Sequence, residues 1–203
     1  MNTISANNQS IIPSKIVCVG RNYVEHIKEL NNEVPTSMVL FMKPNSAISD
    51  ELNTHSKELH YEGEISFLIK NSKISAVGFG LDLTDRKLQG ELKKKGLPWE
   101  RAKAFDGAAV FSGFVDIDED KIDKLNLKLY INGKLAQFGG VELMIYSPTV
   151  ILEEISTFCT LEDGDIVMSG TPKGVGTFKI GDEFRGEIYI DDELVVKKTW
   201  IAV

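Results

Sequence analysis

HYEGEISFLI, the stretch His60–Ile69, decides the fold that we expect for this chain. Its apolar residues Ile65, Phe67 and Ile69 fall on alternate positions, and alternate side chains of a β-strand point to the same face. We therefore predict a strand over Leu59–Lys70 with these three residues on a buried face.

Two carboxylates stand in the same stretch, separated only by Gly63. On a strand, Glu62 and Glu64 project from the same face, and a glycine lets other backbone approach closely. Hard cations such as Mg²⁺, Ca²⁺ and Mn²⁺ prefer such oxygen ligands and leave positions for water and substrate. The spacing therefore suits a metal site, although two acids on a solvated strand face would give the same pattern.

A third acid lies on the next predicted strand, Ser75–Leu83. Asp82 is flanked by apolar residues, and an unpaired buried charge is costly. Either a metal ion or a salt bridge to Arg86, one turn further on, would satisfy this carboxylate.

The remaining pattern is rich in strands and has a few short helices. Apolar spacing predicts helices over Asn22–Asn31 and Thr84–Lys95, and Ser147-Pro148 begin a third that runs through Phe158. Lys93 to Lys95 complement the dipole where the second helix ends. Further strands are expected over Lys15–Gly20, Met38–Met42, Leu125–Ile131, Lys134–Phe138, Asp165–Met168, Glu183–Ile190 and Glu193–Ile201, with a tight hairpin at Asn132-Gly133. Periodicity alone thus indicates an α+β or mostly β domain with a curled sheet.

Composition limits the classes of function. The 203 residues are 42% hydrophobic and carry a formal net charge of -7, so one domain can bury a sufficient core, and nucleic acid is not an expected partner. The apolar runs are far shorter than the roughly 20 residues that cross a bilayer. Since no signal peptide is evident, we expect a cytoplasmic protein with no membrane partner.

The N-terminus and the cysteines offer little chemistry. Residues 1–14 are polar, and we expect them to form an arm that is frayed or held by a partner. Cys18 and Cys159 lack CxxC spacing and are expected to be buried free thiols.

Six blocks in this order resemble the fumarylacetoacetate hydrolase family, most closely its single-domain acylpyruvate hydrolase and oxaloacetate decarboxylase branch. The blocks are KIVCVGRNYVEHIKEL (Lys15–Leu30), LFMKP (Leu40–Pro44), HYEGEISFLI (His60–Ile69), GLDLTDRKLQ (Gly80–Gln89), KKKGLPWERAKAFD (Lys93–Asp106) and LEDGDIVMSGTPKGVG (Leu161–Gly176). The resemblance implies that residues 15–203 form one catalytic domain, a strand-rich α+β mixed β-sandwich roll. It also implies a homodimer, for which light scattering would give twice the chain mass.

The resemblance names the metal ligands. It makes Glu62, Glu64 and Asp82 the ligands of Mg²⁺ or Mn²⁺, with Ca²⁺ able to bind in place of either. In the family the ion chelates a 2-oxo acid through its carboxylate and keto oxygens, and Lys103 matches a lysine beside the ion. Cation and ammonium together stabilise the negative charge of an enolate oxygen.

A histidine and a glutamate match the family's lid over the substrate. His26 and Glu29 are three residues apart, so they share a helix face and the carboxylate can orient the imidazole. A lone His-x-x-Glu is more often a surface pair. Within the GRNYVEHIKEL block, the resemblance implies that this pair activates water.

Four further residues match positions that line the family's substrate pocket: Arg21, Arg86, Gln89 and Thr171. An arginine can hold a carboxylate through two hydrogen bonds, and a threonine in a Gly-rich turn offers hydroxyl and backbone donors. Arg86 could equally be structural.

The chain departs from the family pattern in three places. The segment between Glu64 and Asp82 is shorter than in typical relatives, so Asn71–Val77 must cross by a tighter route. Asp85 stands where a small residue is usual, and Lys87 follows Arg86 where an aspartate is common. Ser169 replaces a threonine but keeps its hydroxyl.

The acyl group and the physiological metal do not follow from these matches, but a reaction class does. They imply a metal-dependent C–C bond hydrolase that cleaves acylpyruvate-type 2,4-dioxo acids through a metal-bound pyruvate enolate. Oxaloacetate decarboxylation or keto–enol tautomerisation is the alternative, since the same chelate would stabilise that enolate without attack by water. A protein that only binds a 2-oxo acid is a third reading, in which His26 and Glu29 would have no use.

Overall fold

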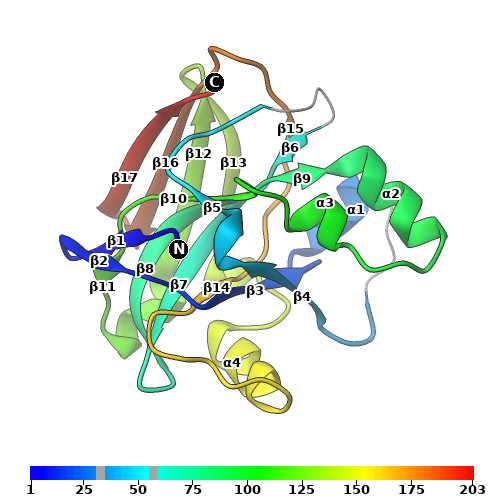
Figure 1. Ribbon diagram of the computed structural model, residues 1–203. Helices are drawn as coiled ribbons and strands as arrows, with labels where there is room; N and C mark the ends of the chain where they lie inside the picture. The colour runs from blue at the N-terminus through cyan, green and yellow to red at the C-terminus, as the bar shows by residue number, and fades with distance from the viewer. Residues whose placement is uncertain (31–34, 55–58) are drawn as a thin grey trace.

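The computed structural model describes residues 1–30, 35–54 and 59–203. Their two larger sheets pack face to face, and helices α1, α2 and α3 are gathered at one end (Figure 1). This is the expected strand-rich α+β architecture with a curled mixed sheet. No helix among the described residues is long and apolar enough to span a membrane.

The larger sheet is mixed and has eight strands. Its order is β4-β3-β14-β7-β8-β10-β5, with β11 also paired to β8. The pairs β3 with β14 and β5 with β10 are parallel, and the other neighbours are antiparallel. The strands are β3 (Lys15–Gly20), β4 (Val39–Pro44), β5 (Ile48–Ser49), β7 (Gly63–Lys70), β8 (Lys73–Asp82), β10 (Ala109–Phe111), β11 (Val115–Asp116) and β14 (Ile166–Met168).

The second sheet is antiparallel, in the order β13-β12-β16-β17, and packs over β7 and β8. Its strands are β12 (Leu125–Ile131), β13 (Lys134–Gly140), β16 (Glu183–Ile190) and β17 (Glu193–Ile201). The main core lies between the sheets, where the rings of Phe79 and Trp200 stand 6.1 Å apart. Gly186 makes room for Phe79, because a Cβ there would lie 2.4 Å from the ring. The sheets therefore pack closely enough to make β7 and β8 a rigid floor for the site.

Short strands and helices complete the fold. A three-stranded sheet has the order β15-β6-β9, and its strands are β15 (Gly176–Thr177), β6 (Leu59–Tyr61) and β9 (Thr84–Asp85). The helices are α1 (Val24–Glu29), α2 (Arg86–Lys94), α3 (Glu100–Lys103) and α4 (Pro148–Ser156), with 3-10 turns η1 (Asn45–Ala47), η2 (Glu119–Lys124) and η3 (Val141–Leu143). The three predicted helices are confirmed, except that Asn31, the expected end of the first, lies outside the described residues. The departure at Asp85 has a local explanation, because its side chain caps α2 by accepting a hydrogen bond from Leu88 N.

Of the two expectations for the N-terminal arm, frayed or held by a partner, the first was wrong. Residues 4–11 form a hairpin of β1 (Ile4–Ala6) and β2 (Gln9–Ile11) that buries Ile4 and Ala6 in a second core cluster. Backbone hydrogen bonds tie this hairpin to Phe114. Polar composition concealed the two apolar anchors, whose burial outweighs the cost of ordering so short a segment. The thiol expectation holds in part: both cysteines are free, Cys18 is buried and Cys159 is partly exposed.

The strands β7 and β8, which carry Glu64 and Asp82, are joined by a two-residue hairpin turn. Lys70 pairs with Lys73, so only Asn71 and Ser72 connect β7 to β8. Both have positive φ, 52° and 59°, as a turn matched to strand twist requires. Glu64 and Asp82 lie near the ends of these strands that are opposite the turn, so the tight turn leaves the site in place.

The predicted strand over Leu59–Lys70 is divided at Glu62. Tyr61 ends β6 in the three-stranded sheet, and Gly63 begins β7 in the large sheet. Between them, the carbonyl of Glu62 accepts a hydrogen bond from Asp82 N at 2.9 Å. Glu62 therefore lies at the junction of two sheets, beside the end of β8.

Candidate functional site

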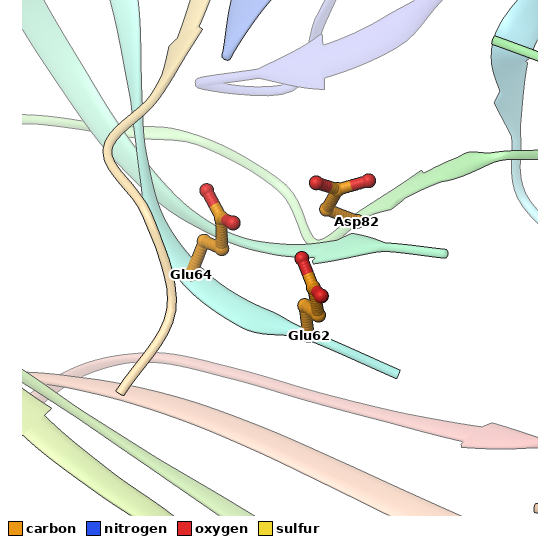
Figure 2. Close-up of side chains that lie close together, drawn as sticks. All are labelled: Glu62, Glu64 and Asp82. Atoms are coloured by element: carbon orange, nitrogen blue, oxygen red, sulfur yellow. The ribbon is translucent and has the colours of Figure 1, made fainter. Parts of the chain in front are cut away.

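Three buried carboxylates converge at the ends of β7 and β8 (Figure 2). Glu62, Glu64 and Asp82 are each at most 5% exposed. One oxygen from each lies within 4.8 Å of the other two. The carboxylates that the sequence places on neighbouring strands are thus brought together in space.

Lys103, at the end of α3, donates to this cluster. Its Nζ is 2.8 Å from Glu62 Oε2, 2.6 Å from Asp82 Oδ2 and 2.6 Å from Thr84 Oγ1. These contacts use all three donors of an ammonium group. Burial alone would lower the pKa of Lys103, but Asp82 and Glu62 raise it above its usual value, so the lysine stays charged. Lys103 is therefore not a surface residue.

Lys43, for which the sequence indicated no role, is a second ammonium in the cluster. It lies on β4, is completely buried, and places Nζ 2.8 Å from Asp82 Oδ1. It also donates to the main-chain carbonyl of Lys103. A lysine inside the apolar run LFMKP was the available signal, because a lysine is almost never fully buried without a partner. Lys43 fixes both Asp82 and the segment that carries Lys103.

The carboxylates differ in their partners. Burial would raise the pKa of Glu62, but Lys103 and Arg86 hold it well below its usual range. The pKa of Glu64 is raised by burial and then by the charge of Asp82 and of Glu62. The Glu64 side chain accepts a hydrogen bond from Gly170 N at 2.8 Å, and no lysine or arginine of the described residues is at ion-pair distance from it. Glu64 thus lacks a compensating cation.

These residues fit a divalent cation. Carboxylate oxygens are the donors that Mg²⁺ and Mn²⁺ prefer, and Glu64 lacks a counter-charge. Asp82 Oδ1 is buried and accepts no hydrogen bond, although Lys43 Nζ lies 2.8 Å from it in an ion pair. A cation held by Glu62, Glu64 and Asp82 would meet both needs.

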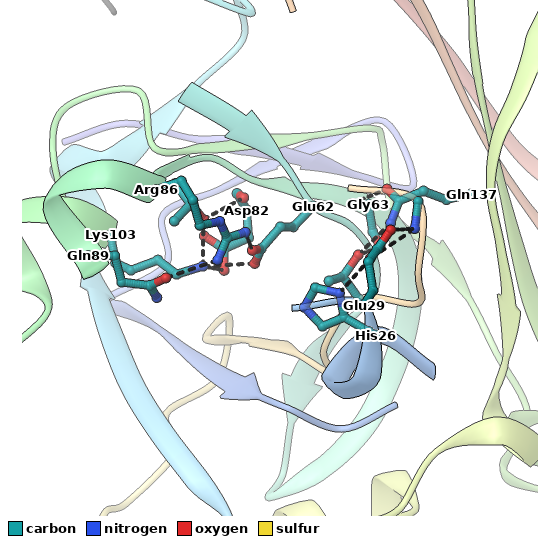
Figure 3. A network of polar contacts seen from close by, with 12 residues as sticks. His26, Glu29, Glu62, Gly63, Asp82, Arg86, Gln89, Lys103 and Gln137 are labelled. Carbon is teal, nitrogen blue, oxygen red and sulfur yellow. Dashed lines mark hydrogen bonds and ion pairs between the residues drawn. The ribbon is translucent and has the colours of Figure 1, made fainter. Parts of the chain in front are cut away.

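Arg86 pairs with Glu62 and not with Asp82. Its guanidinium donates to Glu62 Oε1 and, at 2.9 Å, to Gln89 Oε1. The alternative of a salt bridge from Asp82 to Arg86 is therefore wrong, because Asp82 is already paired with two lysines. Arg86 and Gln89 stand one turn apart on α2 and face the cluster together (Figure 3).

His26 and Glu29 form a pair on α1, on the other side of Glu62 (Figure 3). His26 is 6% exposed, and its Nδ1 lies 3.3 Å from Glu29 Oε2. Burial lowers the pKa of His26 despite the nearby charges of Glu62 and Glu29, so its imidazole is neutral at neutral pH. With Nδ1–H donating to Glu29, Nε2 is the basic nitrogen.

The Gly-rich loop after β14 joins the carboxylate cluster to this pair. Gly170 N donates to Glu64 Oε2, while Gly174 N donates to Glu29 at 3.0 and 3.2 Å. A side chain at position 174 would lie 2.1 Å from the carbonyl of Ala136. The loop is thus closely packed at its distal end. It positions Glu64 of the carboxylate cluster and Glu29 of the pair on α1.

Gln137 on β13 anchors this loop to Gly63. Its Oε1 accepts from Gly63 N at 2.8 Å, and its Nε2 donates to Thr171 Oγ1 and to Pro172 O, both at 2.8 Å. The Thr171 hydroxyl donates in turn to the carbonyl of Gly63 at 2.9 Å. Thr171 therefore uses its hydroxyl within the protein, where the sequence had suggested a donor to substrate.

Replacing Gln137 with leucine is expected to destabilise the protein by about 2 kcal/mol or more, because an unsatisfied buried polar group costs about 1–3 kcal/mol. Gly63 N and Pro172 O would both lose partners. For a chain of this length the melting temperature should fall by roughly 4–8 °C, which differential scanning calorimetry measures. Gln9→Leu, on exposed β2, is the matched control. Equal melting temperatures for the two variants would contradict this role.

The cluster and α1 border a small, partly open pocket of about 30 Å³, which is the space of about one water molecule. Nine of the ten predicted site residues line it: Arg21, His26, Glu62, Glu64, Asp82, Arg86, Gln89, Lys103 and Thr171. The tenth, Glu29, reaches it through His26. Arg21 has a positive φ of 59° at the turn from β3 into α1, an uncommon conformation for a residue with a side chain. Lys93 and Trp99, to which the sequence had given no place in the pocket, also line it.

Comparisons with known proteins agree with this geometry. The family model described as fumarylacetoacetate (FAA) hydrolase C-terminal matches residues 15–198. The oxaloacetate tautomerase YcgM of Escherichia coli is 40% identical over 188 residues, covering 84% of this chain and 86% of that protein. The mitochondrial oxaloacetate tautomerase FAHD1 of Homo sapiens is 40% identical over 194 residues, covering 86% of each.

One similar solved structure carries a metal and a 2-oxo acid. Fumarylpyruvate hydrolase from Pseudomonas aeruginosa, in complex with Mn²⁺ and pyruvate, superimposes with a TM-score of 0.89 at 26% identity. The match covers 100% of this chain and 95% of that one.

Proposed function

This chain belongs to the fumarylacetoacetate hydrolase family, and we propose that within it the protein is an oxaloacetate tautomerase, which interconverts the keto and enol forms of oxaloacetate. The observation that carries the proposal is the 40% identity to oxaloacetate tautomerases over most of both chains. Acylpyruvate hydrolysis was the first expectation from the sequence. Its alternative, oxaloacetate decarboxylation or keto–enol tautomerisation, is better supported by these comparisons.

The carboxylate cluster suits this chemistry. A divalent cation held by Glu62, Glu64 and Asp82 would bind the 2-oxo acid and make the protons on its C3 more acidic. The proposal of Mg²⁺ or Mn²⁺ is supported by the buried acidic triad and by the Mn²⁺ in the fumarylpyruvate hydrolase. Lys103 and Arg86 would balance the charge of the ligands and of the substrate carboxylate.

The proton transfer falls to His26. Enolisation breaks one C3–H bond and forms one O–H bond, so the reaction needs a group that accepts and returns a single proton. A neutral imidazole can do this, and His26 is neutral because burial lowers its pKa. Glu29 holds the ring through Nδ1 and is itself held by Gly174 N. These two residues would thus act as base and positioning residue.

The proposal is tested by dissolving enolic oxaloacetate and following the loss of its ultraviolet absorbance as it relaxes to the keto form. We expect the metal-loaded protein to accelerate relaxation beyond the rate with the same metal alone. Chelation with EDTA should abolish the acceleration, and Mg²⁺ or Mn²⁺ should restore it. Glu91→Gln, an exposed glutamate on α2, serves as the control variant and should behave as wild type.

The same preparation distinguishes the competing activities. Acetylpyruvate and fumarylpyruvate should be cleaved more slowly than oxaloacetate is tautomerised, and oxaloacetate should not be converted stoichiometrically to pyruvate and CO₂. Faster cleavage of an acylpyruvate would restore the hydrolase reading, while rapid release of CO₂ would make the protein a decarboxylase.

A further inference from the structure

One face of α2 presents a row of polar side chains to the cavity. Arg86, Gln89 and Lys93 are spaced by three and four residues, so they lie on the same side of the helix, and all three line the cavity. Arg86 contacts Glu62 at the inner end of this row. Lys93 lies two turns away, about 10 Å further along the axis. The row therefore leads from the carboxylate cluster toward the outer part of the pocket.

Lys93 is fixed in place by aromatic packing. Its Nζ stands 4.7 Å from the ring centroid of Trp99, a cation–π contact. Trp99 in turn packs against Phe41 at 6.0 Å between ring centroids. A lysine held in this way loses less side-chain freedom when it binds a ligand.

Cations affect Lys93 more strongly than the one nearby carboxylate, that of Glu62. Within the described residues no carboxylate lies at ion-pair distance from it, in contrast to Lys43, Lys103 and Arg86. Burial and then the neighbouring cations, Arg21 foremost, lower the pKa of Lys93 to about 8. A half-buried ammonium without a carboxylate at ion-pair distance is stabilised when an anion binds beside it.

We infer that Lys93 binds the second carboxylate of a dicarboxylic 2-oxo acid, at the end of the pocket opposite the carboxylate cluster. The inference deepens the proposed function and rests on it for the reaction, because it names the part of the substrate that the outer pocket selects. The 2-oxo group of the acid lies at the carboxylate cluster, and Lys93 contacts the carboxylate at the other end of the acid. The interaction of Lys93 with the dipole of α2, which the sequence indicated, is then its secondary role.

The test compares two stable ligands that differ only at the far end. Malate carries a second carboxylate where 2-hydroxybutyrate carries a methyl group. Calorimetric titration of the Mn²⁺-loaded wild-type protein should show that malate binds more tightly by roughly 10- to 100-fold, the range of a charge-assisted hydrogen bond. Lys93→Met should lose most of this preference, while its affinity for 2-hydroxybutyrate should change less than about twofold.

Two further variants control the test. Lys94→Met removes an exposed lysine next in sequence and should keep the preference for malate, and Lys93→Arg should keep most of it because the charge remains. Thermal melts report whether each variant is folded. The inference is overturned if wild type binds the two ligands equally or does not bind malate, or if a folded Lys93→Met keeps the preference.

This readout is independent of turnover. A preference for malate that depends on Lys93, in a protein without tautomerase activity, would leave the inference standing and reject the proposed function. An active tautomerase without a preference for malate would reject the inference and leave the proposed function standing.

Discussion

His26→Ala is expected to slow oxaloacetate tautomerisation by roughly 100- to 10,000-fold, the usual cost of losing a positioned general base. The imidazole is buried at the cavity, neutral, and held by Glu29 through Nδ1. Stopped-flow measurement of enol relaxation gives the rate. Calorimetric titration with Mn²⁺ should give an unchanged affinity, because His26 is not one of the three clustered carboxylates.

Glu29→Gln is the companion to this experiment. The amide leaves the imidazole in place but removes the charge that orients it, so a smaller defect of the same kind is expected. Since the two residues act as one unit, the double variant should be little slower than His26→Ala alone. Wild-type rates in His26→Ala would instead assign the pair a purely structural role.

Glu64→Gln is expected to reduce divalent-metal affinity by roughly 100-fold or more, since even changes outside the ligand set cost about 10- to 100-fold. The variant removes one ligand charge while keeping the size of the side chain. Calorimetric titration with Mn²⁺ measures the loss, and the exposed Glu91→Gln is the matched control. Equal affinity in the two variants would exclude Glu64 from the ligand set.

The same variant should stabilise the metal-free protein. The pKa of Glu64 is raised in the folded state by burial, Asp82 and Glu62, so the stability of its protonated form is present at low pH and is lost as pH rises through the raised value. Glutamine stays neutral at every pH. Melting of metal-free Glu64→Gln at neutral pH should therefore occur above that of wild type, and its melting temperature should depend less on pH. A lower melting temperature would contradict this account of the cluster.

Local sequence patterns predicted the elements better than the contacts between them. Alternating apolar residues located β7, and Asn132-Gly133 marked the hairpin between β12 and β13, because strand period and turn chemistry are local properties. The division of the strand at Glu62 was not predictable in this way. It arises because β6 and β7 find partners in different sheets.

The site residues also divide into those that local sequence patterns predicted and those that depend on contacts distant in the sequence. Motif blocks identified the carboxylates, and these converge. Lys43 and Gln137 escaped notice because their partners are distant in the sequence; Gln137, for example, is 74 residues from Gly63. Lys93 was assigned to the helix dipole, since helical spacing shows which residues share a face but not what that face meets. Only the packing of α2 against the cluster and Trp99 reveals its place in the pocket.

The size of the cavity has a kinetic consequence. About 30 Å³ admits one water molecule, whereas a four-carbon acid needs the volume of several. A four-carbon acid exceeds this volume, so binding it would require the side chains around the pocket to move apart. The hydrogen bond from Gly174 N to Glu29 couples the Gly-rich loop to α1, so these two segments would move together. For the proposed tautomerase, this movement would precede proton transfer, and its rate would then be an upper limit on turnover.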